Sequence, residues 1–397
     1  MTVEDSQKGF FEGDDSVLRH YQKDAVRKAI DTRKSTIKAA TGTGKTIIAI
    51  AWLKELDVES LVIVPTQALI FQAWAPKLAF YGFNDVGQYY AFAKVFGKVT
   101  LTTFSSAISH PEIMENVQAV VVDEIHHLGA QTALRRLLPK IKEKEFVLGL
   151  SSVPEREDLT HQFFLKEFPI CYDLTLGTAL KEGFVSPIEI KEIAAEMTLA
   201  ERAKYEMYTD KIQRAFRFCG SNIKRWARCF DPKTRQFPGR QGMWALTLRK
   251  KLLSGVESKK EKVLEVVTKH PDERIILFAE SVPAIESISE YLREAKVRCE
   301  TFHSGTEPWR RMEILEEWGK KFQVLLSCRA LEEGLDVNEV AVGILITSGK
   351  SQRQFVQRMG RIIRPVEGKT ARFYIIYCPN TVEETYSKTV EKILTST

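Results

Sequence analysis

The sequence predicts an α/β fold with two tandem lobes, each a doubly wound parallel sheet, and a small helical insert. Three observations support this prediction. Short Val-, Ile- and Leu-rich runs alternate with helical stretches between residues 35 and 152, and the same alternation resumes at residue 274. A strongly basic segment separates the two regions. The chain of 397 residues is long enough for two or three cores, since single domains usually run ~100–200 residues.

The expected strands lack the apolar–polar alternation of a half-exposed strand, which is typical of parallel strands buried on both faces. In the first lobe we expect strands at 35–40, 60–65, 98–104, 119–124 and 146–152, with crossover helices at 45–56 and 66–81. In the second lobe we expect strands at 274–280, 297–304, 322–327, 340–347 and 371–378. The predicted domains are a first lobe at 1–175, a linker with the basic insert at 176–258, and a second lobe at 259–397.

The composition fits a folded intracellular protein without a membrane span. Apolar residues make up 44% and charged residues 28%, and no apolar run approaches the ~18 residues that cross a bilayer. The polar, acidic start does not resemble a signal peptide. Six cysteines occur without a C-x-x-C pair, so we expect reduced thiols, with a metal at Cys219 and Cys229 as the alternative. The expected compartment is the cytoplasm if the source is prokaryotic or archaeal.

Positive charge is concentrated in one segment. Residues 201–260 hold 16 Lys/Arg and 5 Asp/Glu, a net charge of +11, whereas the whole chain carries only +6. Within the segment, basic residues interleave with Phe216, Phe218, Trp226 and Phe230. Basic groups neutralise phosphates and aromatic faces stack on bases, so we expect Lys224, Arg225 and Trp226 to contact nucleic acid. The alternative is a solvated helical pair with a core of aromatic side chains. The turn-rich residues 230–242 are expected to form a loop between two helices.

The stretch AATGTGKT, residues 39–46, follows an expected strand and precedes an apolar helix. This context is typical of a phosphate-binding loop. Glycines let backbone N–H groups approach phosphate at a helix N-terminus, Lys45 reaches the terminal phosphates, and the Thr46 hydroxyl helps to hold Mg²⁺. Ala39 replaces the first glycine of the general pattern. The remaining predicted contacts of this loop are Thr41, Gly42, Thr43 and Gly44.

The stretch VVVDEIHH ends a buried strand with an acidic pair. Asp123 is expected to hold the Mg²⁺ shell, and Glu124 to orient and deprotonate the attacking water. His126 is a candidate for coupling the nucleotide to the second lobe, and a packed or capping histidine is the alternative.

Two further segments complete the predicted ATP site. Gln22 offers an amide that can pair bidentately with adenine, and Arg19 is placed beside the same nucleotide. Near the C-terminus, Gln357, Arg361 and Arg364 are spaced by three or four residues and share one face of an expected helix. An arginine supplied from the second lobe would stabilise charge on the γ-phosphate, an effect worth ~10³–10⁵ in rate. An exposed basic helix is the alternative.

Together these motifs resemble a superfamily 2 helicase of the DExH kind. The resemblance runs from Leu18 to about Cys378 and rests on YQ, ATGTGKT, VPTQAL, TTF, DEIH, GLSS, ILFAES, EEGLDV and QRMGRIIR, in that order. It implies two RecA-like lobes, ATP and Mg²⁺ as cofactors, and DNA as a partner. It also implies that Thr66, Thr103 and the region of Gly334 touch the nucleic-acid backbone, and that Asp336 lies near the nucleotide.

Within the superfamily, the chain most resembles the XPB group of DNA repair and transcription helicases. EREDLT matches the Arg-Glu-Asp motif of that group, which implies that Arg156, Glu157 and Asp158 lie near a strand fork. The basic insert falls where XPB proteins carry a helical thumb. XPB relatives also carry a damage-recognition domain before the motor, whereas about seventeen residues precede the first motif here. We therefore do not expect this chain to sense damage alone.

One motif departs from the pattern. Motors of this kind read Ser-Ala-Thr where this chain reads Ser151-Ser152-Val153. A missing neutral hydrogen bond is worth ~0.5–1.5 kcal/mol, which is too little to abolish catalysis, and Ser151 and Ser152 can supply a substitute donor. We therefore expect a working monomeric motor. The family resemblance implies that it unwinds DNA in the 3′–5′ direction and acts on single-stranded, forked or duplex DNA with a nuclease, repair or transcription partner.

Two alternatives stay open. One is an ATP-gated clamp that opens duplex DNA without processive unwinding, which the altered motif favours. The other is the motor subunit of a restriction or nuclease complex, because ALKEGFVSP resembles inter-lobe segments of such translocases.

Overall fold

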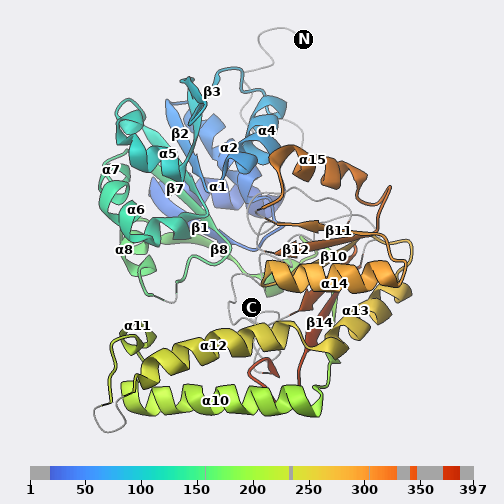
Figure 1. The fold of residues 1–397 in the computed structure, drawn as a ribbon. Helices are drawn as coiled ribbons and strands as arrows, with labels where there is room; N and C mark the ends of the chain where they lie inside the picture. Colours follow the sequence, from blue (N-terminus) through green and yellow to red (C-terminus); the bar gives the residue numbers. More distant parts are fainter. Residues whose placement is uncertain are drawn as a thin grey trace.

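Two mostly parallel sheets, each covered by helices, form the two lobes of the protein (Figure 1). The computed structural model describes residues 18–156, 158–231, 236–303, 305–328, 340–346 and 370–384. The predicted α/β fold with two lobes and a helical insert is confirmed within these ranges.

The first lobe contains an eight-stranded sheet in the order β4-β3-β5-β2-β6-β7-β1-β8, in which only the β3–β4 pair is antiparallel. All five strands that we expected in this lobe are present. Its strands are β1 (Lys34–Ala39), β2 (Ser60–Val64), β3 (Val86–Tyr90), β4 (Ala93–Val95), β5 (Val99–Thr103), β6 (Ala119–Asp123), β7 (Phe146–Ser151) and β8 (Ile170–Leu174).

The helices of the first lobe follow the predicted crossovers, with one irregularity. The helix expected at 66–81 contains a π-helical turn in the middle. The helical elements are α1 (His20–Thr32), α2 (Lys45–Leu56), α3 (Gln67–Leu69), η2 (Ile70–Trp74), α4 (Ala75–Phe80), α5 (Phe104–Ser109), η3 (Pro111–Met114), η4 (Ile125–Gly129), α6 (Gln131–Arg136), α7 (Leu138–Ile141), α8 (His161–Glu167) and α9 (Leu176–Lys181).

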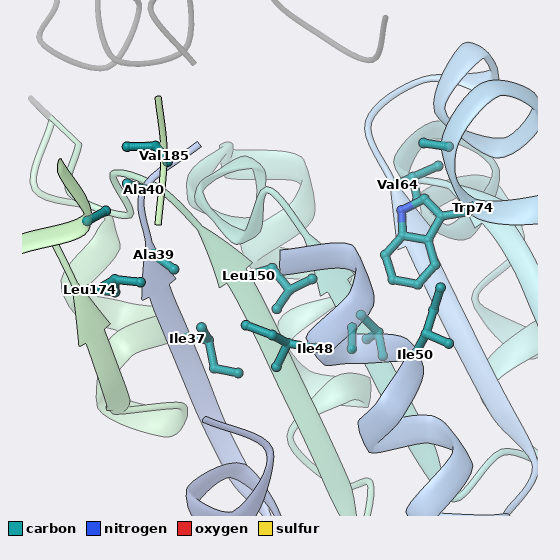
Figure 2. Close-up of a cluster of buried hydrophobic side chains, with 14 of the residues drawn as sticks. Ile37, Ala39, Ala40, Ile48, Ile50, Val64, Trp74, Leu150, Leu174 and Val185 are labelled. Atoms are coloured by element: carbon teal, nitrogen blue, oxygen red, sulfur yellow. The ribbon is translucent and has the colours of Figure 1, made fainter. Parts of the chain in front are cut away.

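Apolar residues of α2 pack on the sheet directly below the phosphate loop. Ile48 faces Ile37 of β1 and Leu150 of β7, whereas Ile50 lies beside Trp74, and all these side chains are fully buried (Figure 2). Burying such a side chain stabilises the fold by about 1.5–3 kcal/mol. The core therefore fixes the start of α2 relative to the ends of the strands.

The second lobe contains a six-stranded sheet in the order β11-β12-β10-β13-β14-β9, parallel throughout. The five strands that we expected here are present. The strands are β9 (Ile188–Ala194), β10 (Ile275–Ala279), β11 (Cys299–Phe302), β12 (Val324–Cys328), β13 (Val342–Ile346) and β14 (Ala371–Tyr377). The covering helices are α13 (Glu257–Lys269), α14 (Val282–Glu294) and α15 (Pro308–Glu317).

Strand β9 belongs to the second sheet although it precedes the basic insert. It pairs with β14 along its whole length, from Ile188 opposite Ala371 to Ala194 opposite Tyr377. The second lobe therefore begins before the insert, which is an insertion within that lobe. The predicted domain ranges stay predictions, except that β9, which lies within the predicted linker, belongs to the second lobe.

The basic insert forms two long antiparallel helices that lie side by side below the second lobe (Figure 1). They are α10 (Leu199–Cys219) and α12 (Pro238–Ser254), joined through the short α11 (Ile223–Trp226). We call residues 199–254 the thumb. The loop that we expected at 230–242 is shorter than predicted, because α12 already begins at Pro238, a residue suited to the first turn of a helix.

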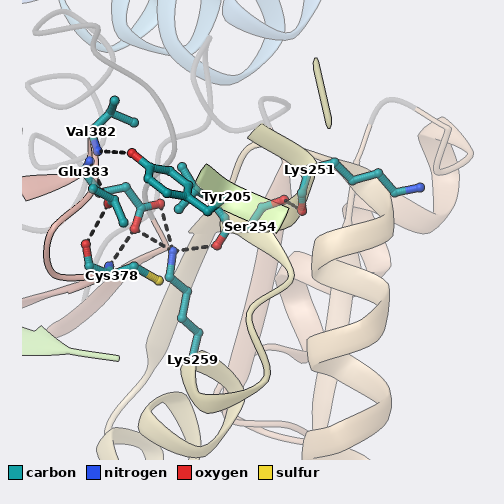
Figure 3. A network of polar contacts seen from close by, with 9 residues as sticks. Tyr205, Lys251, Ser254, Lys259, Cys378, Val382 and Glu383 are labelled. Carbon is teal, nitrogen blue, oxygen red and sulfur yellow. Dashed lines mark hydrogen bonds and ion pairs between the residues drawn. The ribbon is translucent and has the colours of Figure 1, made fainter. Parts of the chain in front are cut away.

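The base of the thumb is joined to the second lobe by a buried polar network (Figure 3). Lys259 Nζ forms an ion pair with Glu383 and donates to the carbonyl of Leu253 at the end of α12. The Tyr205 hydroxyl, from α10, accepts from the Val382 backbone N–H at 3.0 Å. Arg202 adds bonds to the carbonyls of Pro379 and Asn380. Both thumb helices are therefore fixed to the chain that follows β14.

The described residues contain neither a membrane-spanning helix nor a metal cluster of His, Cys, Asp and Glu. None of their helices combines the length and apolarity needed to cross a bilayer. Within these same ranges no group of three or more His, Cys, Asp and Glu side chains is arranged to hold a metal, so the Cys219–Cys229 metal alternative lacks a third ligand of these types.

Candidate nucleotide and nucleic-acid site

The predicted ATP-site residues of the first lobe meet at one edge of its sheet. The neighbouring strands β6, β7 and β1 are parallel, so their carboxyl ends lie together. The strand ends carry Asp123, Ser151 and the phosphate loop, respectively. Ligands of open α/β sheets bind outside the carboxyl ends of the strands. The sheet therefore brings these motifs together although they are far apart in the sequence.

The phosphate loop has the backbone that its glycines allow. Gly42 and Gly44 have φ values of +92° and +84°, a region that favours glycine. Helix α2 begins at Lys45, so its first-turn N–H groups face the loop. Lys45 Nζ donates to the Ala39 carbonyl at 3.0 Å, which places the ammonium group over the loop. Thr43 is buried and its hydroxyl donates to Ala40, whereas Thr41 and Thr46 are half-buried.

Gln22 supports the phosphate loop from α1. Its Nε2 donates to the Thr43 carbonyl at 3.1 Å, and its Oε1 accepts from the Arg19 N–H at 2.9 Å. A Cβ atom on Gly44 would lie 2.5 Å from this Nε2, so only glycine fits there. Gln22 is only 5% exposed. A bidentate contact with adenine stays a prediction, and it would have to use the remaining N–H and lone pair of this amide.

The hydroxyl of Tyr21, a residue that we did not single out, also donates to the Thr43 carbonyl, at 2.7 Å. The Tyr21 ring stacks on Phe184 at 4.2 Å, and Arg19 Nη1 donates to the Phe184 carbonyl. The segment that leads to the second lobe is therefore held against α1, next to the phosphate loop. Aromatic residues beside a recognised motif are the signal that would have identified Tyr21.

Asp123 is buried and both of its oxygens are hydrogen-bonded. Oδ1 accepts from the Glu124 N–H at 3.0 Å, and Oδ2 accepts from Trp74 Nε1 at 2.9 Å. Burial, followed by the negative charge of Glu124, raises the pKa of Asp123 to about 6, although Trp74 and Lys45 act in the opposite direction. When no metal ion is bound, the Asp123 carboxyl group therefore titrates close to neutral pH.

Glu124 lies in a small polar cluster with His126 and Ser151. Its Oε2 is 3.3 Å from His126 Nδ1 and 3.5 Å from the Ser151 hydroxyl, and that hydroxyl is also 3.3 Å from His126 Nδ1. Burial acts to raise the pKa of Glu124, but His126 and then Lys45 lower it to about 2. Glu124 thus stays ionised, as a base requires. Its backbone has φ +49°, which is uncommon outside glycine.

The altered motif keeps one of its hydroxyls at the centre of this cluster. The Ser151 hydroxyl accepts from the Val153 N–H at 3.3 Å and reaches towards Glu124. The Ser152 hydroxyl is buried and has no hydrogen-bond partner among the described residues. Ser151 is therefore the stronger candidate for the substitute donor.

Arg156 and Asp158 bind each other. Arg156 Nε and Nη2 donate to the two oxygens of Asp158 at 3.0 and 2.9 Å, while Nη1 donates to the His126 carbonyl at 3.0 Å. The bond from Arg156 holds the pKa of Asp158 well below its usual range. This motif therefore braces the segment that carries His126. A place near a strand fork stays a prediction, and Glu157 lies outside the described residues.

Thr66 and Thr103, which were expected to touch the nucleic-acid backbone, begin helices at the same edge of the sheet. Thr103 caps α5, because its hydroxyl accepts from the Ser106 N–H at 3.2 Å. The Thr66 hydroxyl oxygen is buried without a hydrogen-bond partner among the described residues. In this conformation neither hydroxyl is presented to solvent, so the backbone contacts stay predictions that need a local rearrangement.

The expected base-stacking role of Trp226 is wrong for this conformation. Its side chain is 0% exposed and packs in a small core with Ile212, Ala215 and Ala245. Its Nε1 donates to the Gly220 carbonyl at 2.8 Å. A buried ring has no face for a base, so here the aromatic-core alternative holds. Lys224 and Arg225 are exposed, as contacts with phosphate require.

Trp244 of α12 is the exposed tryptophan of the thumb. It is 53% exposed and lies 4.9 Å from Lys211 Nζ. Phe216, Phe218 and Phe230 are also partly exposed. Base stacking by exposed rings of the thumb therefore stays a prediction, to which Trp226 does not contribute. The remaining predicted residues, Gly334, Asp336, Gln357, Arg361 and Arg364, lie outside the described residues.

ATP with Mg²⁺ fits the described part of the site. The loop has two glycines with positive φ, Lys45 Nζ is hydrogen-bonded to its first residue, and the buried carboxylate of Asp123 ends a strand at the same edge of the sheet. The chemistry of these donors suits a triphosphate with a hard divalent cation, which prefers oxygen ligands.

Two families match the chain. Residues 15–156 match "Type III restriction enzyme, res subunit" and residues 258–366 match "Helicase conserved C-terminal domain". The solved Hef helicase domain of Pyrococcus furiosus superposes with a TM-score of 0.61 at 16% identity, covering 94% of this chain and 98% of that one. This likeness concerns the fold.

Curated relatives span both lobes. The "DNA 3'-5' translocase XPB2" of Sulfurisphaera tokodaii is 26% identical over 87% of this chain and 78% of its own length. The "Putative DNA 3'-5' helicase Rad25" of Halobacterium salinarum is 25% identical, and the "DNA 3'-5' helicase XPB" of Mycobacterium tuberculosis is 22% identical. They cover 94% and 95% of this chain, which spans only 56% and 63% of their lengths. These matches support a superfamily 2 helicase of the XPB group.

Proposed function

We propose that this protein is a DNA-dependent ATPase that moves along DNA in the 3′–5′ direction and opens duplex DNA. The observation that carries the proposal is the meeting of Lys45, Asp123, Glu124 and Ser151 at one sheet edge, at the ends of three adjacent strands. The direction and the DNA substrate rest on the printed names of the relatives.

Each described residue has a role in this proposal. Lys45, which donates to the Ala39 carbonyl here, would bind the terminal phosphates, and Thr46 and Asp123 would hold Mg²⁺. When bound, the nucleotide supplies the phosphoanhydride bond whose hydrolysis drives movement. Glu124 stays ionised beside His126 and takes a proton from water. Ser151 connects Glu124 with the end of β7.

The second lobe would complete the site. Arg361 and Arg364 supply positive charge to the γ-phosphate, Gln357 shares their predicted face, and Asp336 lies near the nucleotide. These four residues are proposals from the sequence. Gly334, Thr66 and Thr103 would hold one DNA strand, with Lys224 and Arg225 of the thumb on the neighbouring phosphates. Closure of the lobes would then gate hydrolysis.

The relatives that span both lobes favour this motor over the two alternatives, a non-processive clamp and the motor subunit of a nuclease complex. The match to a restriction-enzyme subunit covers the first lobe only. We further propose a monomer that works with a repair or transcription partner.

The test measures ATPase rates without DNA and with single-stranded, duplex and forked DNA, together with strand displacement from a 3′-tailed duplex. We expect DNA to stimulate hydrolysis and the 3′-tailed substrate to be unwound. Stimulation without displacement would identify the clamp. Hydrolysis that ignores DNA would contradict the proposal.

A further inference from the structure

Trp74 is the one side chain that joins the helix after Thr66 to the acidic pair by a direct hydrogen bond among the described contacts. Its Nε1 donates to Asp123 Oδ2 at 2.9 Å, and its side chain is fully buried. Figure 2 shows its ring beside Ile50 and Val64, in the core below the phosphate loop. The indole thus reaches the predicted metal-holding carboxylate from within the protein.

A π-helical turn directs Trp74 inward. In η2 the N–H of Ala75 donates to the carbonyl of Ile70, five residues earlier. The cause lies in the next residue, because Pro76 has no N–H and its ring conflicts with the carbonyl four residues before it. The widened turn absorbs this conflict. It also places Trp74 at the end of the turn, where the ring faces the sheet instead of solvent.

The hydrogen bond restricts how the Asp123 carboxylate can turn. Its other oxygen accepts from the backbone of Glu124, so each oxygen is held by a donor that is itself fixed. One donor belongs to the residue that follows Asp123, and the other belongs to η2. Partners of a metal-ligating carboxylate typically change metal affinity 10–100-fold when they are removed.

The same helix begins at a residue predicted to touch DNA. Thr66 is the N-terminal flanking residue of α3, without a side-chain capping bond, and α3 continues without a break through η2 into α4. Trp74 lies eight positions after Thr66, which is roughly 12 Å of helix at ~1.5 Å per residue. A DNA strand that shifts the N-terminal end of this helix, at Thr66, would also move the Trp74 indole and hence the Asp123 carboxylate.

We propose that Trp74 is a positioning residue that orients the Asp123 carboxylate for Mg²⁺ and transmits DNA contact at Thr66 to that carboxylate. This inference rests on the proposed function, because it takes Asp123 as the Mg²⁺ ligand and Thr66 as a DNA contact. It adds a connection between the two sites that neither motif contains.

The chain offers a matched control for the test. Trp52, on α2, is also fully buried in the same core, and its Nε1 has no hydrogen-bond partner among the described residues. Trp74→Phe and Trp52→Phe therefore make the same change in ring size, and only the first removes the bond to Asp123. Where Trp74→Phe fails to fold, benzothienylalanine at position 74 replaces the N–H by sulfur and keeps the shape of the ring.

The measurement is the binding of a fluorescent ADP analogue at increasing Mg²⁺, with and without a single-stranded oligonucleotide. We expect Trp74→Phe to need about 10-fold more Mg²⁺ for half-maximal binding and to lose the effect of the oligonucleotide on that midpoint. Trp52→Phe should match the wild type in both respects. Equal midpoints for Trp74→Phe and Trp52→Phe would overturn the positioning role. An oligonucleotide effect that survives in Trp74→Phe would overturn the transmission.

Failure of the proposed function looks different from failure of this inference. In that case the wild type itself would show no Mg²⁺-dependent nucleotide binding or no response to DNA. The inference fails on its own when the wild type responds to both and Trp74→Phe responds equally.

Discussion

Lys259 and Glu383 form a buried ion pair that fixes the thumb to the second lobe. The Nζ–Oε1 distance is 2.8 Å, and both side chains are 1% exposed (Figure 3). Glu383 also accepts from the Cys378 N–H, and Lys259 donates to the end of α12. The pair therefore joins α13, the end of the thumb and the turn after β14. Movement of the second lobe will carry the thumb with it.

Lys259→Met should destabilise the protein strongly. Removing one partner of a buried pair leaves the other charge without compensation, which typically costs about 3–5 kcal/mol. We expect the loss in the free energy of unfolding in urea. Lys262→Met removes a more exposed pair with Glu265 and should cost no more than about 1 kcal/mol. The double variant Lys259→Met/Glu383→Leu should recover part of the loss, and no recovery would contradict the interpretation.

The reactivity of Cys378 provides an independent test of the packing at the base of the thumb. Burial raises the pKa of this thiol to about 12, so the reactive thiolate is scarce at pH 8. Iodoacetamide should label Cys378 slowly in the wild type and faster in Lys259→Met. Equal labelling rates in the wild type and in Lys259→Met would show that the base of the thumb stays packed without the ion pair.

Glu124→Gln should bind ATP and DNA normally and lose turnover. A glutamine keeps the size of the side chain but cannot accept the proton, and general base catalysis typically contributes 10²–10⁴-fold. We expect kcat to fall at least ~10²-fold, measured under saturating DNA. Glu143→Gln, at an exposed position, is the control. Turnover at the wild-type rate would remove Glu124 from the proposed role.

Asp123 should make the nucleotide-free protein less stable as the pH rises. Its folded pKa of about 6 lies above its ordinary value of 3.8, so the folded state holds the proton more tightly and stability declines through that window. Between pH 5 and pH 8 the decline is on the order of 1 kcal/mol.

The variant Asp123→Asn does not titrate and should lack this decline, so its advantage over the wild type should grow towards pH 8. Urea unfolding in EDTA at several pH values measures the difference. An advantage that is constant across this range would show that the carboxylate is already ionised at pH 5.

Trp244 and Trp226 should respond to alanine in opposite ways. Trp226→Ala removes the centre of the thumb core, which typically costs about 3–5 kcal/mol. Trp244→Ala removes an exposed ring and should leave stability nearly unchanged. Stacking on a base is worth ~1–3 kcal/mol, so affinity for single-stranded DNA should fall roughly 5- to 150-fold. Fluorescence anisotropy with a labelled oligonucleotide tests this, and unchanged affinity would exclude Trp244 from the DNA surface.

Lys224 and Arg225 should contribute to the salt dependence of DNA binding. Each phosphate contact releases counterions and adds about 0.7–0.9 to the slope of log K against log salt. Replacing both residues by alanine should therefore lower the slope by about 1.4–1.8. The paired control is Lys140→Ala, on the first lobe. A slope that does not change would place the DNA path elsewhere.

The sequence was most informative where one residue type has one local meaning. Helix α2 begins and ends at the predicted residues, because glycines precede Lys45 and its apolar run has no alternative. Strand β9 was missed because it lies beside β14 with alternate residues exposed, and its Glu and Lys side chains mask the pattern. The antiparallel β3–β4 pair at the sheet edge escaped for the same reason.

In the site too, residues that belong to local motifs were predicted, and residues whose role depends on packing were not. Lys45, Asp123 and Glu124 were predicted from motifs whose chemistry is local, and the structure places them at one edge of the sheet. Trp74 was not predicted, because no local pattern connects it to a carboxylate 49 residues further along the chain. Trp226 was misassigned because basic and aromatic residues interleave in the same way in a stacking surface and in a small helical core. Only packing distinguishes the two.

The two ends of the thumb leave the second lobe at a single place. The Ser258 hydroxyl donates to the Glu196 carbonyl at 2.6 Å, and the Glu257 N–H donates to Glu201 at 3.2 Å. Because the two ends of the thumb lie next to each other, its removal would not interrupt any strand pairing in either sheet. A short linker at that point would replace the thumb and leave both lobes intact. Other helical hairpins could be inserted at the same position to give the two lobes a different accessory domain.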